Sequence, residues 1–180
     1  MSSPTAVTYN IDPVHSHVGF SVRHLGISHV RGEFTKVSGT LTYEPDQPES
    51  SVVEVVIETA SFSSGQDQRD AHIRTAEFLD ADTYPTITFK STKVERTGAD
   101  GGTVTGDLTL HGVTKEVVLT VEGPTPEVTD PYGGKRIGVE ATTKINRKDY
   151  GIVWNATLET GHLLIGDVVT LTLDVQFVKS

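Results

Sequence analysis

The 180-residue sequence contains no cysteine and no apolar run near the length that crosses a membrane. The first absence excludes disulfides, thiolate nucleophiles and cysteine-based zinc sites. The second gives no sign of an integral membrane segment. The first ten residues also lack the basic start and apolar stretch of a secretory signal. We therefore expect a cytoplasmic protein, or a periplasmic or secreted one if a signal has been removed.

Basic residues are also few, since 15 lysines and arginines stand against 24 aspartates and glutamates, a net charge of -9. Such a balance works against binding to phosphate backbones or anionic bilayers. Nucleic acid is therefore not expected as a partner. The length suits a single domain with one core, so we assign residues 1–180 to one domain.

Apolar and polar residues alternate with a period of two along much of the chain, which is typical of strands with one buried and one solvent-exposed face. The clearest case is residues 168–177, where apolar residues alternate with threonine, aspartate and glutamine. Threonine and valine, which strands favour, dominate the other segments. The predicted strands are residues 18–25, 29–35, 37–43, 52–58, 86–94, 103–110, 117–121, 138–145 and 168–177.

Short links rich in turn residues separate these strands, at residues 44–51, 98–102, 111–112 and 123–134. Strands so closely spaced can pair as antiparallel neighbours without crossover helices. About eight of them can close into a barrel, and closure removes the exposed edges that a sandwich would leave. We predict an all-β, antiparallel barrel of about eight strands.

One segment, residues 64–79, carries little period-two signal. Ile73, Ala76 and Leu79 form a short apolar stripe at helical spacing, and Pro85 argues against a longer helix. We interpret the segment as a short helical cap over one end of the barrel. The alternative is a crossover loop with a single turn of helix.

A polar cluster near the N-terminus contains Asp12, His15, Ser16 and His17. Catalytic triads gather residues from distant parts of a chain, so we favour hydrogen bonds from backbone amides to Asp12 and Ser16. On a strand, His15 and His17 would share a face, as ligands of some metal sites do. No metal or other cofactor is expected, because the remaining histidines are scattered: His24, His29, His72, His111 and His162.

Two basic segments have two interpretations each. Residues 69–74 can grip an anionic head group with two guanidinium groups, or can form an exposed network of ion pairs. Residues 147–150 can form a polar rim at the mouth of a pocket or a salt-bridged turn. Trp154, the only tryptophan, is typical of a core, although in a hollow barrel a core residue can also contact a ligand.

A series of short motifs runs along the chain. They are DPVHS at residues 12–16, RDAHIR at 69–74, YP at 84–85, GDLTLHGVT at 106–114, NRKDYG at 146–151 and GDVV at 166–169. Taken in this order, the motifs resemble those of the YceI-like family, and the resemblance extends from about residue 9 to residue 177. It implies a lipocalin-like barrel whose elongated apolar pore holds a polyisoprenoid, such as a prenyl quinone or a prenyl pyrophosphate.

We accordingly predict a protein that binds, carries or stores such a long-chain lipid and is not an enzyme. A barrel of eight strands is wide enough for one slender ligand. The expected lining residues are Phe20, Val22, Phe34, Phe78, Phe89, Leu108, Leu119 and Trp154, with His24, Arg69, His72 and Arg74 at the polar end.

Two alternatives stay open. A metal-dependent or hydrolytic enzyme would use Asp12, His15 and His17. A structural or stress-related protein would have a filled barrel, and inward-facing residues are apolar in hollow and filled barrels alike. The sequence also leaves the oligomeric state open, with a homodimer as one option.

Overall fold

The computed structural model describes residues 6–159, 161 and 163–180, which form twelve strands, one short α-helix and four 3-10 turns. The strands are β1 (Val7–Ile11), β2 (His17–His24), β3 (Ser28–Phe34), β4 (Val37–Tyr43), β5 (Val52–Glu58), β6 (Phe62–Ser63), β7 (Thr86–Arg96), β8 (Gly101–Leu110), β9 (Val113–Glu122), β10 (Val128–Thr129), β11 (Lys135–Asn146) and β12 (Ile165–Lys179). The helix is α1 (Asp67–Ile73), and the 3-10 turns are η1 (Pro13–His15), η2 (Pro48–Ser50), η3 (Thr59–Ser61) and η4 (Arg147–Tyr150).

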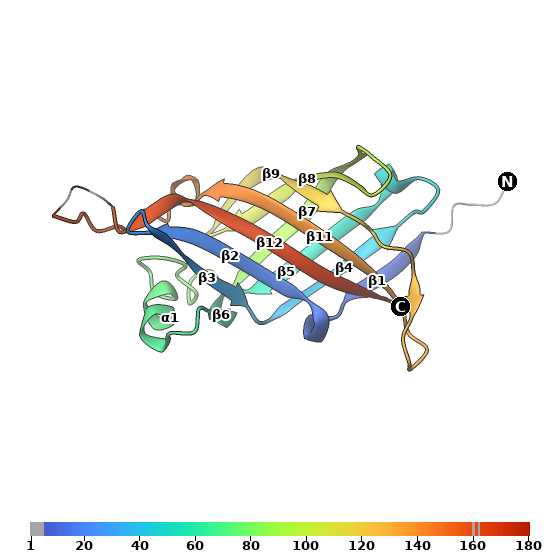
Figure 1. The fold of residues 1–180 in the computed structure, drawn as a ribbon, viewed down its shortest axis with the longest axis horizontal. Helices are drawn as coiled ribbons and strands as arrows, with labels where there is room; N and C mark the ends of the chain where they lie inside the picture. The colour runs from blue at the N-terminus through green and yellow to red at the C-terminus, as the bar shows by residue number, and fades with distance from the viewer. Residues whose placement is uncertain (1–5, 160, 162) are drawn as a thin grey trace.

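The sheet closes on itself because β12 pairs on both of its edges (Figure 1). One edge pairs with β11 over residues 168–178. The other edge pairs with β2 over residues 165–174 and with β1 over residues 177–179. β1 and β2 therefore occupy a single position in the wall, interrupted by η1.

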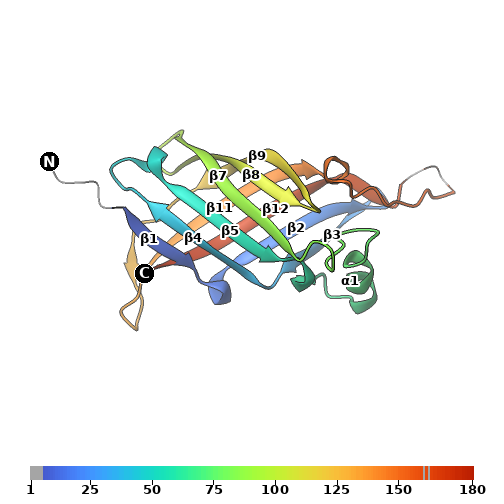
Figure 2. The ribbon, with the colours of Figure 1, turned by 180° about the vertical axis from the view of Figure 1, so that it is seen from behind.

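Two other wall positions are also shared by consecutive strands. β3 pairs with β2 while β4 pairs with β1, and then β6 pairs with β3 while β5 pairs with β4. β7, β8 and β9 continue from β5 to β11 and complete the circuit (Figure 2). In the described chain the wall thus has eight antiparallel strand positions, which confirms the predicted barrel.

All nine predicted strands are present, and the differences lie mainly in their lengths. β9 and β12 each extend several residues beyond the predicted ends. β1 was missed because it offers only five residues, and β6 and β10 have two residues each, too few for a periodic signal. Hydrogen bonds to a neighbouring strand define such short segments, and a local pattern cannot reveal them.

The segment at residues 64–79 combines features of both interpretations. Its helix ends at Ile73, so the predicted helical stripe is wrong: Ala76 lies beyond the helix and is exposed. Phe78 and Leu79 nevertheless turn inward and are buried in the core. Asp70, itself buried, accepts hydrogen bonds from the amide and hydroxyl of Ser64 and fixes the start of the helix. The segment therefore caps one end of the barrel, as predicted.

Buried apolar residues gather at the two ends of the barrel. One cluster lies beneath α1 and η4 and includes Phe62, Phe78 and Ile152. The other lies where β1, β11 and β12 end and includes Tyr9, Ile137 and Phe177. Other inward-facing side chains, among them Leu119, Leu171 and Leu173, are only half-buried. No helix among the described residues combines the length and the apolarity needed to span a membrane.

Candidate binding cavity

A cavity of about 380 Å³ runs through the interior of the barrel. Its lining is almost wholly apolar and comes from all eight wall positions, because alternate residues of every strand point inward. Along β12 the lining extends from Ile165 to Phe177, which is about 40 Å of strand at the usual rise per residue. At the usual tilt of strands in a barrel, this corresponds to roughly 30 Å along the axis.

The pattern of burial along β12 shows that the barrel is hollow. Val175 and Phe177 are each 5% exposed, whereas Leu171 and Leu173 are only half-buried although they belong to the same inward row. Their polar neighbour Thr172 points outward and is exposed. The accessible area of the two leucines therefore faces the cavity. The filled barrel, which the sequence could not exclude, is not what the fold contains.

Two glycines make room for aromatic rings along the wall. Gly32 pairs directly with Phe20, and a Cβ atom at Gly32 would lie 2.5 Å from the Phe20 ring. A Cβ atom at Gly106 would likewise lie 2.5 Å from the ring of Phe89. The Phe20 ring stacks on that of Phe62 with centroids 4.8 Å apart. The rings of Phe20 and Phe89 thus occupy the space that a side chain at Gly32 or Gly106 would need.

The two ends of the cavity differ in their access to solvent. At the α1 end the lining residues Phe62, Phe78 and Ile152 are buried, which closes the cavity. At the other end the lining reaches the β7–β8 hairpin and includes the exposed residues Glu95, Arg96 and Ala99. The cavity therefore opens to solvent at the end opposite α1.

Seven of the predicted lining residues lie in this cavity wall. They are Phe20, Val22, Phe34, Phe78, Phe89, Leu108 and Leu119. Trp154 lies just outside it and packs against Phe78 with ring centroids 5.0 Å apart. As ligand contacts, all of these residues stay predictions.

The residues predicted for the polar end do not line the cavity: His24, Arg69, His72 and Arg74. The Arg74 guanidinium donates to the backbone carbonyls of Ala60 and Phe62, and that of Arg69 donates to Ser64. His72 pairs with Glu77. The two arginines are thus engaged in local hydrogen bonds that hold α1 against the barrel, and neither pairs with a carboxylate of the described residues, so the predicted network of ion pairs is reduced to the single contact between His72 and Glu77.

Arg147 is a residue whose burial the sequence did not predict. It is 4% exposed, and it donates to the carbonyls of Ile152, Trp154 and Gly166. Burial lowers the pKa of its guanidinium, and Asp167, 3.7 Å away, opposes that shift. η4 is therefore a salt-bridged turn, one of the two interpretations of residues 147–150, and Arg147 also contributes to the closed end of the cavity. The NRKDYG motif at residues 146–151 was the only sequence feature that drew attention to Arg147.

The N-terminal polar cluster is structural. Asp12 accepts a hydrogen bond from the Val14 amide at 2.9 Å, and Ser16 accepts one from the Gln176 amide at 3.1 Å. This confirms the favoured interpretation of these two residues. Arg136 donates to Asp12 at 2.6 Å and, together with His15, lowers the pKa of the Asp12 carboxyl to about 2.

His15 and His17 do not share a strand face, which corrects the premise of the metal hypothesis. His15 lies in η1 and contacts Asp12 at 2.8 Å, whereas His17 begins β2 and contacts Glu33 at 2.8 Å. Three histidine or carboxylate side chains placed to share a metal ion are not found among the residues that the structure describes. His162 lies outside those residues.

Closed wall, apolar bore and one open end define a barrel of the kind that encloses a slender apolar ligand. The chain belongs to the YceI-like family, whose domain model matches residues 9–177. A UPF0312 protein of Vibrio cholerae is 44% identical over 149 residues, which cover 82% of this chain and 78% of that protein. One from Pseudomonas putida strain W619 is 44% identical over 151 residues, covering 82% and 77%.

Solved structures show the same fold. The Campylobacter jejuni YceI protein matches with a TM-score of 0.73 at 30% identity, covering 88% of this chain and 90% of its own. Burkholderia cenocepacia BcnA matches with a TM-score of 0.79 at 21% identity, covering 92% and 98%. A polyisoprenoid binding domain from Saccharophagus degradans matches with a TM-score of 0.67 at 18% identity, covering 98% and 100%.

Proposed function

We propose that this chain binds one long-chain lipid, a polyisoprenoid such as a prenyl quinone or a prenyl pyrophosphate, in the barrel cavity. The observation that carries the proposal is the long apolar bore, whose inward side chains are left with accessible area that a chain-like ligand would cover. The fold neighbour described as a polyisoprenoid binding domain supports this class of ligand. Binding in such a bore suits the carriage or storage of a lipid.

Burial of apolar surface supplies the affinity without a catalytic or charged group. Each 100 Å² of apolar area removed from water contributes about 2.5 kcal/mol. The lining offers few polar side chains, and one of them, the hydroxyl of Thr143, is already bonded to the Val118 carbonyl. A slender chain therefore gains from contact along the whole bore.

A binding role is favoured over catalysis because Asp12, the carboxylate of the catalytic alternative, has structural partners and does not line the cavity. Asp12 and Arg147 each bind backbone or side-chain groups that join elements of the fold. The two other sequence-based predictions, a cytoplasmic location and a homodimer, are kept here as predictions. Cell fractionation and analytical ultracentrifugation would check them.

A matched pair of adjacent residues tests the proposal. Leu119 lines the cavity, whereas Val118 points outward and is 50% exposed. A charge at Leu119 would have to be buried against any bound lipid chain, so Leu119→Glu should abolish retention of an added prenyl quinone. Val118→Glu should retain it like the wild type. The measurement is co-elution of the quinone with the protein in size-exclusion chromatography.

Circular dichroism establishes that both variants are folded. If Leu119→Glu destabilises the barrel, Leu119→Gln replaces it in the experiment, because glutamine is polar but uncharged and similar in size to glutamate. Equal retention of the quinone by a folded Leu119 variant and by Val118→Glu would remove the cavity as the binding site.

A further inference from the structure

The outer face of β11, β12, β2 and β3 carries its charges in two separate zones. Strand register places Lys144 beside Thr170, Thr170 beside Ser21 and Ser21 beside Arg31, so these residues form one row across four strands. Arg23 and His29 form a direct cross-strand pair one step nearer the β2–β3 hairpin. This basic zone, made of Arg23, His29, Arg31 and Lys144, contains no carboxylate.

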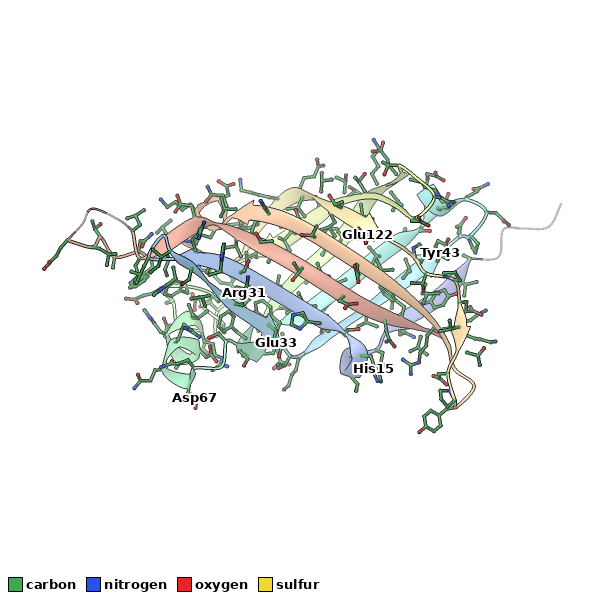
Figure 3. All side chains as sticks on the ribbon, in the orientation of Figure 1. His15, Arg31, Glu33, Tyr43, Asp67 and Glu122 are labelled. Atoms are coloured by element: carbon green, nitrogen blue, oxygen red, sulfur yellow. The ribbon has the colours of Figure 1, made fainter. Side chains whose placement is uncertain are left out.

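The acidic zone lies on the same face, farther from that hairpin. Glu140 is paired with Glu122 on one side and with Asp174 on the other, and Asp174 is paired with His17. Glu33 lies two residues beyond Arg31 on β3 and contacts His17. Figure 3 labels Arg31, Glu33 and Glu122 on this face, with Arg31 nearest the hairpin end. The net charge of -9 therefore hides a local separation of charge along the barrel.

The basic zone has no internal compensation. Arg23 faces His29 and Arg31 faces Ser21 across the two strands, so no carboxylate lies directly opposite either arginine. Arg23, Arg31 and Lys144 are exposed, and among the ion pairs of the described residues none involves them. Such a zone is available to an anionic partner.

Exposed apolar side chains project from the end of the barrel next to the basic zone. Ile27, in the β2–β3 hairpin, is 78% exposed, and Leu163 is 44% exposed. The Leu25 amide donates to the Leu164 carbonyl at 2.9 Å, which holds the hairpin beside the segment that carries Leu163. Burial of an exposed leucine or isoleucine side chain away from water is favourable.

We propose that this tip, Ile27 and Leu163 flanked by the basic zone, docks on the surface of an anionic lipid bilayer. Apolar side chains inserted at the interface and lysine or arginine residues near the head groups act together in peripheral membrane binding. Arg23 and His29 lie within about one Debye length of the hairpin turn, where the attraction to anionic lipids is strong. Asp167, at the start of β12, lies 3.3 Å from Lys148 and 3.7 Å from Arg147, which compensate its charge.

The docking of the tip does not depend on what the cavity holds. The inference therefore goes beyond the proposed lipid-binding function, and either can fail without the other. The composition of the whole chain argues against anionic surfaces, but the outer face of β2, β3 and β11 groups Arg23, Arg31 and Lys144 near the hairpin.

Co-sedimentation with lipid vesicles tests the inference. Wild-type protein should bind vesicles of phosphatidylcholine with about 30% phosphatidylglycerol and should dissociate from them at high salt. It should not bind vesicles of pure phosphatidylcholine. Arg23→Glu combined with Arg31→Glu should weaken binding about tenfold or more, because each cation near an anionic surface contributes roughly 1 kcal/mol. Ile27→Asp should weaken it several-fold.

Matched controls lie at the opposite end of the barrel. Lys93→Glu combined with Lys135→Glu changes the net charge by the same amount, and Tyr132→Asp replaces a side chain that is 97% exposed. Neither should change vesicle binding more than twofold. Circular dichroism verifies folding, and Arg23→Gln combined with Arg31→Gln replaces the charge reversal if that variant unfolds. No binding to anionic vesicles, binding lost equally in the controls, or capture of nucleic acid instead of vesicles would each overturn the proposal.

Discussion

Gly32 and Gly106 lie beneath the rings of Phe20 and Phe89, where a single extra carbon would collide with each ring. A Cβ atom at Gly106 would also lie 2.5 Å from the Lys90 carbonyl oxygen, a backbone atom of the paired strand, so movement of the Phe89 ring alone would not relieve the clash. Glycine is therefore required at this position by packing, and the width of the bore depends on it.

Gly106→Val should narrow the cavity, because the ring of Phe89 has to move toward the axis. We expect a loss of stability of about 1–3 kcal/mol, as for other overpacked cores. Retention of an added prenyl quinone should fall by more than the stability loss explains. Urea unfolding and co-elution of the quinone measure the two effects.

Gly98→Ala is the control for this substitution, since no atom lies within 4 Å of a Cβ placed there. It should leave both stability and retention close to the wild-type values. Full retention of the quinone by folded Gly106→Val would show that the Phe89 ring does not set the bore.

At the scale of elements, three wall positions are built from two strands each, and the joint between β1 and β2 is held by Asp12. Its carboxylate accepts from Arg136 of β11 at 2.6 Å and from the Val14 amide of η1 at 2.9 Å. Arg136 also donates to Asp130 at 2.7 Å and lowers the pKa of that carboxyl too. Asp12 therefore links the turn between β1 and β2 to β11.

The pKa of Asp12 predicts how this joint responds to acid. The hydrogen bond from Arg136 and that from His15 lower the pKa from 3.8 to about 2, so the folded state holds the carboxylate more strongly than the unfolded chain. The Asp12 side chain is 14% exposed, and the shift corresponds to roughly 2 kcal/mol of stability. This stability is present above pH 4 and is lost as the pH falls toward 2.

Asp12→Asn should thus be about 2 kcal/mol less stable than the wild type at pH 7, and the difference should shrink between pH 4 and pH 2. Asp46→Asn, an exposed turn residue, should show no such difference. Urea unfolding curves over that pH range give the comparison. A difference between Asp12→Asn and wild type that does not change with pH would contradict the account of this joint.

The elements were predictable from sequence to the extent that their signals are local. β4 and β5 were predicted to the residue, because their alternation begins and ends at turns. The paired use of β1 with β2, and of β5 with β6, could not be predicted, since it depends on which strands meet after the chain has closed. The partners of the cap arginines could not be predicted for the same reason: the carbonyls that bind Arg74 come from residues 60–62, which contain no charge to reveal them.

At the scale of the whole molecule, the feature that matters most for function was invisible in the sequence. Alternation identifies which residues point inward, and seven of the predicted lining residues do lie in the cavity wall. Whether inward residues meet at the axis depends on the number of strand positions and on their tilt. The half-buried side chains of Leu171 and Leu173 on β12 show that the interior is hollow, but their exposure is known only from the closed barrel.

The central claim is that this hollow barrel holds a long-chain lipid, and native mass spectrometry of the purified protein tests it most directly. Organic extraction and identification of the bound molecule follow. The account predicts a near-stoichiometric complex with one polyisoprenoid or similar single-chain lipid, lost in Leu119→Glu and kept in Val118→Glu. A protein that is empty when purified and that also fails to bind added prenyl quinones would contradict it.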